Sequence, residues 1–227
     1  LGVDATLILP FDEAMSQIPA EAFIKGLAVD LGRISSICVG AQFAFGQGRK
    51  GNVDLLHQLG QELHFVAHGT ASVALDGETV SSTRIRQAIA GGQLDLAGQM
   101  LGREYALTGK VVRGDQRGRE LGFPTANLEI TGRCTPPNGV YAAHAEVDSE
   151  PYRAAVNIGL RPTIKDPEPT LHVEAHLLDF DEEIYERVCA LTFVGKLREE
   201  QSFDSLDALR AQIEKDVVQA RYLFTQL

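Results

Sequence analysis

Residues 109–128 read Gly109-Lys-Val-Val-Arg-Gly-Asp-Gln-Arg-Gly-Arg-Glu-Leu-Gly-Phe-Pro-Thr-Ala-Asn-Leu128, which predicts a strand, a glycine- and arginine-rich loop and a second extended segment. The loop glycines permit left-handed backbone or close approach to a ligand. Arg117 and Arg119 lie between these glycines and are candidate partners for phosphate oxygens. Pro124 favours extended backbone at Phe123. The stretch therefore predicts a phosphate-binding loop that leads into a strand.

Thr125 and Asn127 follow that proline at alternate positions. If the chain continues as a strand, a hydroxyl and an amide carbonyl oxygen face the same side. Hard oxygen ligands of this kind suit a magnesium ion that carries nucleotide phosphates. The stretch lacks the Gly-Lys-Ser/Thr element of a P-loop, so it predicts a different phosphate cradle. The local pattern alone is equally compatible with a β-turn capped by an edge strand.

The charge balance favours a small anionic ligand over nucleic acid. The 227 residues carry a formal net charge of −10, which argues against general binding to a phosphate backbone. A local basic patch is nevertheless present at Lys110, Arg113, Arg117 and Arg119. We therefore expect a small phosphate-bearing ligand and no nucleic-acid partner.

The apolar residues and the cysteines indicate a cytoplasmic protein. No apolar run approaches the roughly 20 residues that span a bilayer, so we expect no membrane insertion. Cys38, Cys134 and Cys189 are widely separated and lack metal-ligand spacing. Free, mostly buried thiols in a reducing compartment are the expected state. The oligomeric state is left open by the sequence.

The second half of the chain predicts a small antiparallel β-barrel. Segments rich in β-branched and aromatic residues, separated by turns, lie at 105–112, 140–147, 152–158, 171–178 and 188–193. Residues 204–224 predict a long helix, with Asp204 as its cap. Its apolar stripe consists of Leu206, Leu209, Ile213, Val217, Ala220 and Phe224.

The first hundred residues predict an α/β unit with a parallel sheet covered by helices. Strands are expected at 5–9, 34–39 and 63–67, and helices at 19–31 and 53–63. A short helix ending in glycine near residue 102 places the domain boundary there. The expected domains are therefore 1–102 and 103–227.

Four ordered motifs carry a family resemblance over about half of the chain: 109–128, Pro137-Asn-Gly-Val-Tyr-Ala142, Asn157-Ile-Gly-Leu-Arg-Pro-Thr163 and Leu171-His-Val-Glu-Ala-His-Leu-Leu-Asp-Phe180. Together they resemble the flavokinase signature of bacterial bifunctional riboflavin kinase/FAD synthetases. The resemblance implies a flavokinase barrel with a long C-terminal helix, preceded by part of a nucleotidyltransferase-like doubly wound sheet. It also implies riboflavin, FMN and ATP as ligands, with Mg²⁺ bound alongside ATP.

The resemblance assigns site residues by position in this sequence. The ATP-binding residues it implies are Gly109, Gly114, Arg117, Gly118, Arg119, Gly122, Pro124, Thr125 and Asn127, with Thr125 and Asn127 also binding the metal. The flavin-binding residues it implies are Gly139, Tyr141, Asn157 and Arg198. Read without the resemblance, Tyr141 is a barrel core residue, Asn157 forms a turn, and Arg198 is a solvated side chain.

Glu174 is the predicted catalytic residue. In the strand 171–178 apolar residues alternate with His172, Glu174 and His176, so these three share the polar face. By resemblance Glu174 accepts the proton of the riboflavin 5′-hydroxyl. A zinc site is not expected, because the outer histidines would lie roughly 13 Å apart at ~3.4 Å per residue, whereas zinc–ligand bonds are ~2 Å long.

The N-terminal half resembles the adenylyltransferase half of the same family only in part. Phe43-Ala-Phe-Gly-Gln-Gly-Arg-Lys-Gly51 and Val80-Ser-Ser-Thr-Arg-Ile-Arg86 resemble its later nucleotide-binding motifs. Candidate phosphate-binding residues of the second motif are Ser81, Ser82, Thr83, Arg84 and Arg86, with Ser82 or Thr83 alternatively a simple helix cap.

Two features predict that this half is catalytically incomplete as given. The sequence lacks the family's Phe-Asp-Gly-Val-His-x-Gly-His motif, and Gln42 and Ala44 stand where the family has an acidic and a basic residue. Because the first residue is Leu1 rather than Met, we expect the chain to begin within a longer gene product. Truncation and natural loss of the motif are not distinguished by the sequence.

The sequence therefore predicts an ATP- and magnesium-dependent riboflavin kinase. Bifunctional FAD synthetase is the alternative if the native chain extends upstream. A non-catalytic flavin- or nucleotide-binding module remains a further alternative, and an oligonucleotide-binding barrel is disfavoured by the acidity and by the scarcity of aromatic residues around the basic loop.

Overall fold

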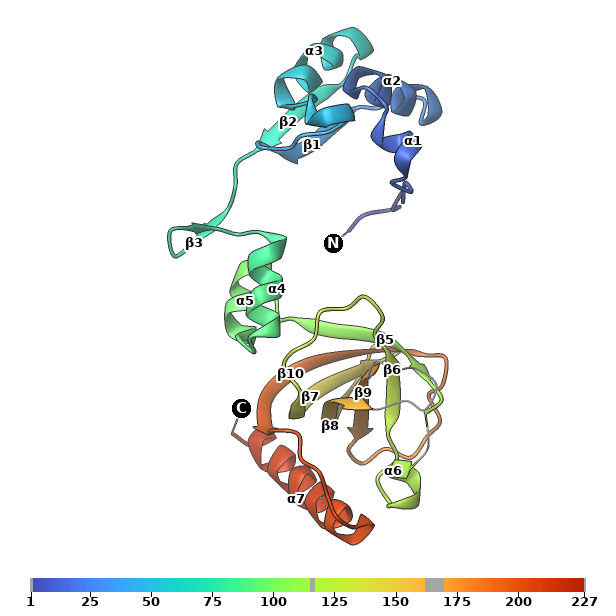
Figure 1. Cartoon of the computed structure of the whole chain (residues 1–227), viewed down its shortest axis with the longest axis vertical. Helices are drawn as coiled ribbons and strands as arrows, with labels where there is room; N and C mark the ends of the chain where they lie inside the picture. Colours follow the sequence, from blue (N-terminus) through green and yellow to red (C-terminus); the bar gives the residue numbers. More distant parts are fainter. Residues whose placement is uncertain (1, 115–116, 162–169, 227) are drawn as a thin grey trace. The chain divides into compact units, whose positions relative to one another are not determined.

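The computed structural model describes residues 2–114, 117–161 and 170–226. The chain forms two compact units, Leu1–Val80 and Ser81–Leu227 (Figure 1). This division precedes helices α4 (Ser82–Ala90) and α5 (Leu94–Leu101), whereas the sequence predicts a boundary after them. The assignment of functions to 1–102 and 103–227 stays a prediction.

The second unit contains the predicted antiparallel barrel. Its strands are β5 (Ala106–Val112), β6 (Ala126–Glu129), β7 (Gly139–Val147), β8 (Glu150–Arg161), β9 (Thr170–Leu177) and β10 (Val188–Arg198). They close in the order β10-β5-β6-β9-β8-β7, and every neighbouring pair is antiparallel (Figure 1). The predicted fold class of this half is confirmed.

Alternation along the strands fills the barrel interior. In β5 the side chains of Leu107 and Val111 are buried, and in β8 those of Val156 and Ile158 are buried. Successive residues of a strand point to opposite faces, so such alternation places one apolar face inside the barrel. Cys189 of β10 is fully buried in this core. All three cysteines are free thiols, as predicted, but the expectation that they are mostly buried is wrong, because Cys38 is exposed and Cys134 is only partly buried.

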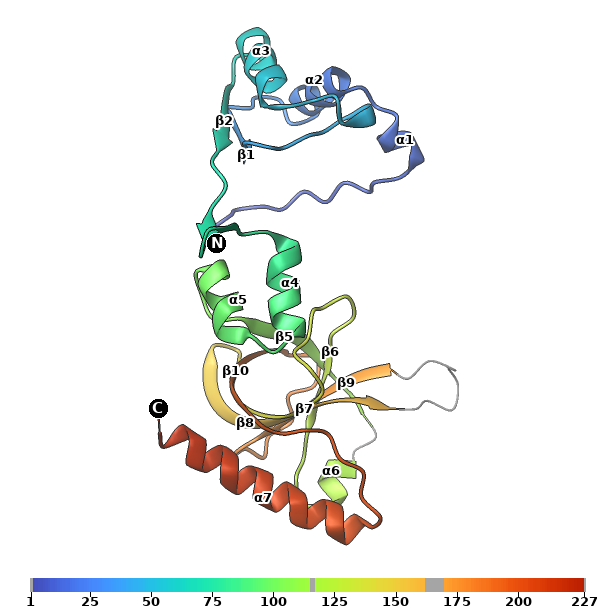
Figure 2. The same ribbon diagram turned by 60° about the vertical axis from the view of Figure 1, so that its left-hand side comes forward.

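Helix α7 (Leu206–Phe224) lies along one side of the barrel, against β7, β8 and β10 (Figure 2). Ala220 and Phe224 are buried against Ala142 and Leu178. Leu206 departs from the predicted apolar stripe because its side chain is 67% exposed. The helix is thus anchored to the barrel through its C-terminal turns.

The prediction that Asp204 caps this helix is wrong. The N-cap is Ser205, whose backbone is extended and whose side chain accepts a hydrogen bond from the Ala208 amide at 3.2 Å. An N-cap must combine that extended backbone with an acceptor that reaches the first turn. Ser205 meets both requirements, and Asp204 lies one residue outside the cap position.

Replacing Ser205 with alanine is expected to lower the free energy of unfolding by about 1 kcal/mol, because the Ala208 amide loses its acceptor. Asp204→Ala is the matched control and should change the stability by less than about 0.5 kcal/mol. Denaturant unfolding followed by circular dichroism measures both variants. A larger loss in Asp204→Ala than in Ser205→Ala would assign the capping function to Asp204 after all.

The first unit is a small α/β arrangement. Strand β1 (Ser36–Gly40) pairs in parallel with β2 (Val66–Thr70), and helices α2 (Ala20–Asp30) and α3 (Val53–Leu63) pack with them around Ile24, Leu56, Leu59 and Phe65. The unit also contains α1 (Glu13–Ser16), η1 (Gln47–Arg49), β3 (Ala74–Leu75) and β4 (Glu78–Thr79). The predicted α/β character is confirmed.

The expected strand at residues 5–9 is wrong. These residues form no strand, and Leu7 and Ile8 are 62% and 83% exposed. A strand exists only where a neighbour pairs with its backbone groups, and in the described part of the chain β1 pairs with β2 alone.

None of the described helices is long and apolar enough to cross a membrane.

Candidate active site

One row of directly opposed residues crosses five strands of the barrel. Asn127 of β6 is paired with Glu174 of β9, and Glu174 is paired with Asn157 of β8. Asn157 is in turn paired with Val140 of β7, which is paired with Arg198 of β10. Directly opposed residues lie on the same face of a sheet. Four polar residues that are distant in sequence therefore share one face of the barrel.

The next row faces the opposite way. Ala126, Ala175, Val156 and Tyr141 are paired in succession, and all four are buried in the barrel core. Since adjacent residues in a strand alternate between faces, the polar row lies on the outer face. A one-residue shift of register would exchange the two rows and bury the polar groups.

A cavity of about 320 Å³ lies over the polar row. Glu174, Asn157 and Arg198 contribute to one side, and the apolar residues Leu209, Ile213 and Val217 of α7 contribute to another. The remaining lining residues are Gly118, Leu121, Phe123, Thr125, Val140, Ala155, His176, Glu200, Gln201, Phe203 and Asp216. The lining thus combines apolar side chains, which can cover a ring system, with polar groups that can fix its orientation, as small-molecule sites do.

Glu174 lies beside the predicted metal ligands. The Thr125 hydroxyl is within 3.5 Å of Glu174 Oε2, and Asn127 is its direct neighbour on β6. His176 Nδ1 lies 2.8 Å from the carbonyl oxygen of Pro124, a contact that holds the segment preceding Thr125. The Thr125 hydroxyl and the Glu174 carboxylate therefore lie on the wall of the larger cavity, and Asn127, which lines neither cavity, is the strand neighbour of Glu174.

This donor set fits a magnesium ion. Mg²⁺ in nucleotide-dependent enzymes binds through one or two protein oxygens, with phosphate oxygens and water completing its octahedron. Gly114 supports the fit, because a Cβ at this position would lie 2.5 Å from Asn127 Oδ1. The glycine thus leaves room for the Asn127 side chain. The residues present suit Mg²⁺ carried by a nucleotide.

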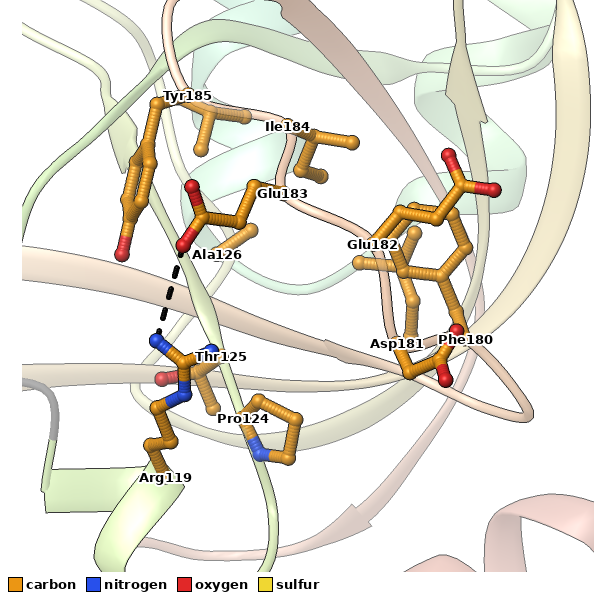
Figure 3. Close-up of a pocket in the computed structure, with 12 residues that line it drawn as sticks. Arg119, Pro124, Thr125, Ala126, Phe180, Asp181, Glu182, Glu183, Ile184 and Tyr185 are labelled. Atoms are coloured by element: carbon orange, nitrogen blue, oxygen red, sulfur yellow. Dashed lines mark ion pairs between the residues drawn. The ribbon is translucent and has the colours of Figure 1, made fainter.

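A second cavity of about 230 Å³ adjoins the first at Thr125, which lines both. Arg119, from the short helix α6 (Arg117–Glu120), reaches toward Glu183, with 3.7 Å between Nη1 and Oε1 (Figure 3). The other lining residues are Val111, Pro124, Ala126, Leu177, Phe180, Asp181, Glu182, Ile184 and Tyr185. Phe180 ends the fourth motif, whereas residues 181–185 belong to none of the motifs, so the sequence did not predict them.

The predicted ATP-binding residues are gathered only in part. Arg119, Pro124 and Thr125 line the smaller cavity, and Gly118 lines the larger one. At Gly118 a Cβ would lie 2.4 Å from the Phe123 carbonyl oxygen and 3.1 Å from the Thr125 hydroxyl. This glycine therefore allows the loop to close onto Thr125.

Two other predicted residues of this loop lie outside the cavities. Gly109 lies within β5, opposite Cys189, and Gly122 has a left-handed φ of 86° in the turn after α6. Neither residue lines a cavity. The side chain of Arg117 falls outside the described part of the structure.

The predicted flavin-binding residues divide into two pairs. Asn157 and Arg198 line the larger cavity. Gly139 lies against β10 instead, where a Cβ would be 2.6 Å from the Arg198 carbonyl oxygen. Tyr141 is 3% exposed, and its hydroxyl donates a 2.5 Å hydrogen bond to the Pro137 carbonyl oxygen. The structure does not bring Gly139 or Tyr141 to the cavity.

Tyr141→Phe is expected to lower the free energy of unfolding by about 1 kcal/mol through the lost hydrogen bond, and to leave unchanged the KM for riboflavin, the substrate that the family resemblance predicts. Burial raises the pKa of Tyr141 to about 12. As the pH rises, the Tyr141 phenol ionises in the unfolded state before it ionises in the folded state. The contribution of the phenol to stability is therefore complete below about pH 10 and declines toward pH 12. Unfolding curves and riboflavin kinetics at two pH values test this. A large rise in KM would place the phenol in the flavin site.

Residues 81–86, from the motif that resembles a nucleotide-binding motif of the adenylyltransferase half, lie at the start of the second unit. Ser81 is the N-cap of α4 and accepts a hydrogen bond from the Arg84 amide at 3.2 Å, so the cap is neither Ser82 nor Thr83. Arg86 offers its backbone carbonyl oxygen to Cys134 Sγ. The phosphate-binding role of these residues stays a prediction.

Several cavity residues were missed because they come from α7 and from the segment before it. Phe203, Leu209, Ile213, Asp216 and Val217 all line the larger cavity. Leu209, Ile213 and Val217 belong to the stripe that predicted packing against the barrel. An apolar stripe identifies the face of a helix that is shielded from water, but it does not show whether that face packs against protein or against a ligand.

Comparison with known proteins assigns the chain to a family. Residues 101–224 match the family model of riboflavin kinase, and residues 1–84 match that of FAD synthetase. Over 222 residues the chain is 39% identical to the bifunctional riboflavin kinase/FMN adenylyltransferase of Pseudomonas fluorescens, and over 224 residues it is 40% identical to that of Escherichia coli K12. Each alignment covers 98% of this chain and 71% of the relative. The chain belongs to the bifunctional riboflavin kinase/FMN adenylyltransferase family.

The solved structures include a relative of the same fold. A crystal structure described as a macrolide-efflux protein from Streptococcus pneumoniae has a TM-score of 0.71 and 29% identity, covering 93% of this chain and 67% of that one. The part of this chain that matches riboflavin kinase, residues 101–224, contains the whole barrel, all of α7 and both cavities. The predicted family resemblance is confirmed.

Proposed function

We propose that this chain is an ATP-dependent riboflavin kinase, which transfers the γ-phosphate of ATP to the 5′-hydroxyl of riboflavin and yields FMN and ADP. One observation carries the proposal: Glu174 is paired with Asn127 across the sheet, and its carboxylate lies within 3.5 Å of the hydroxyl of Thr125, the residue that borders both cavities. The family match at residues 101–224 supplies the reaction class.

The two cavities suit the two substrates. Riboflavin fits the larger one, where the apolar residues of α7 can cover the ring system while Asn157 and Arg198 offer polar contacts. The nucleotide occupies the smaller cavity, with its phosphates directed to Thr125 because that residue borders both. Arg119 and the backbone around Gly118 are then positioned to contact phosphate oxygens.

The chemistry follows from that arrangement. The Glu174 carboxylate accepts the proton of the riboflavin 5′-hydroxyl while the hydroxyl oxygen attacks the γ-phosphorus. The new phosphorus–oxygen bond forms as the bond to the β,γ-bridging oxygen breaks, and ADP leaves with the electron pair. Thr125 Oγ1 and the Asn127 amide oxygen would hold Mg²⁺, which when bound neutralises charge on the phosphates. Because the two cavities hold riboflavin and ATP in fixed positions, the 5′-hydroxyl and the γ-phosphate meet in the orientation that the reaction needs.

FMN adenylyltransferase activity is the second candidate, favoured by the match of residues 1–84 to FAD synthetase. Gln42 and Ala44 argue against it, because this activity needs charged groups that handle a nucleotide. A cytoplasmic location is part of the proposal, and the three free thiols support it.

The test is an incubation of the 227-residue chain with riboflavin, ATP and Mg²⁺, followed by chromatography for FMN and FAD. FMN alone is the expected product. FAD in addition would assign adenylyltransferase activity to the N-terminal unit. Riboflavin binding without any product would contradict the kinase and leave a flavin-binding module.

A further inference from the structure

Asp216 of α7 is the one buried charged or polar residue among those that the structure describes, with 3% of its surface exposed. It lines the larger cavity together with Arg198, Phe203 and Val217. A carboxylate in such a place needs compensation, because removing a charge from water costs several kcal/mol unless it is paired and hydrogen-bonded. Its partners therefore indicate what it does.

The main partner is Arg198. The Arg198 Nε lies 2.8 Å from Asp216 Oδ1 and 3.0 Å from Oδ2, and Nη2 lies 2.7 Å from Oδ2. Gln212, one turn earlier in α7, donates a further hydrogen bond to Oδ1 at 2.8 Å. The Arg198 and Asp216 side chains are only 16% and 4% exposed. This pair is a bidentate, nearly dry ion pair, which fixes both distance and orientation.

The ion pair determines where the guanidinium plane lies. The remaining terminal nitrogen, Nη1, donates to the Glu199 carbonyl oxygen at 2.9 Å. The Phe203 ring centre lies 5.8 Å from the guanidinium carbon, within range of a cation–π contact. Arg198 also ends the polar row that contains Glu174. Asp216 thus holds a cavity-lining cation that is aligned with the catalytic face.

We infer that Asp216 is a positioning residue of the flavin cavity, acting through Arg198 and Phe203 rather than on the substrate itself. The inference rests on the proposed riboflavin kinase function. Without Asp216 the guanidinium would lose its fixed plane, and the aromatic ring that packs on it would lose its support. The flavin would then be bound less tightly and in a less uniform position.

A second ion pair on α7 provides the comparison. Arg221 donates to Asp179 through both terminal nitrogens, at 2.8 and 2.6 Å, but the two side chains are 45% and 74% exposed. Neither residue lines a cavity. Arg221→Gln therefore breaks a bidentate pair of the same helix without touching the flavin site, which makes it the matched control.

The first experiment compares the wild type, Asp216→Asn and Arg221→Gln in riboflavin fluorescence titrations and steady-state kinetics. Asp216→Asn is expected to raise the Kd and KM for riboflavin about 10- to 100-fold, the scale of a small misplacement of a positioning group. The ATP KM should stay unchanged, and Arg221→Gln should match the wild type. An unchanged riboflavin Kd in Asp216→Asn would overturn the inference.

A double variant separates positioning from mere stability. Replacing both partners, as Arg198→Met with Asp216→Leu, removes the buried charges together and is expected to restore folding even if Asp216→Asn folds poorly. Flavin affinity should remain low in the double variant. Recovery of wild-type affinity would show that the pair only stabilises the fold. If the wild type makes no FMN, the proposed function fails, while the titration still decides the role of Asp216.

Discussion

Glu174→Gln is expected to lower kcat for FMN formation about 10²–10⁴-fold, the usual contribution of general-base catalysis. Glutamine has nearly the same shape as glutamate, but its amide cannot accept the proton of the 5′-hydroxyl. The residue lies in the polar row between Asn127 and Asn157, on the outer face of the barrel. We therefore expect the barrel to fold normally and both KM values to change little.

The control for this variant is Glu129→Gln. Glu129 is an exposed glutamate of β6 that lines neither cavity, so the same chemical change there should leave kcat intact. Chromatographic measurement of FMN under saturating substrates gives kcat for each variant. A kcat of wild-type size in Glu174→Gln would remove this carboxylate from the mechanism.

Thr125→Val is expected to produce the second large effect, a rise of at least about tenfold in the Mg²⁺ concentration needed for half-maximal rate. Losses of 10- to 100-fold are typical even for residues that only support a metal ligand. Valine keeps the shape of threonine and removes the hydroxyl that lies within 3.5 Å of Glu174 Oε2. Because Thr125 borders both cavities, kcat should fall as well.

Thr192→Val provides the matched control, since Thr192 lies on β10 opposite Ala106 and His144 and lines neither cavity. Titration of the initial rate with Mg²⁺ at fixed ATP measures both variants. A Thr125→Val enzyme with a wild-type Mg²⁺ requirement would assign the metal to other oxygens. A similar shift in Thr192→Val would mean that the change reports fold rather than metal binding.

Local sequence patterns predicted the elements that build the site. The period-two alternation of the strands gave the barrel its inner and outer faces, and the apolar stripe of residues 204–224 predicted α7. Pro124 and the alternation after it predicted the shared face of Thr125 and Asn127, whose neighbours Ala126 and Leu128 are indeed buried. Each of these features depends on residues that are close together in the chain.

Other features depend on partners that are far apart in the chain. The register of β6, β8, β9 and β10 aligned Asn127, Glu174, Asn157 and Arg198, and the same register turned Tyr141 into the core. The segment at residues 5–9 has strand-like composition but lacks a pairing neighbour among the described residues. Composition indicates that a segment favours the strand conformation, but the segment forms a strand only when a neighbouring strand pairs with it.

The sequence by itself therefore determined the family, the two kinds of fold and the catalytic glutamate proposed here. Only the tertiary structure decided which predicted residues reach a cavity, that α7 lines the larger cavity, and that Asp216 is paired with Arg198 there. The physical reason is the range of the interactions involved. Backbone propensity and alternation act over a few residues, whereas strand register, helix docking and buried ion pairs arise from packing between distant segments.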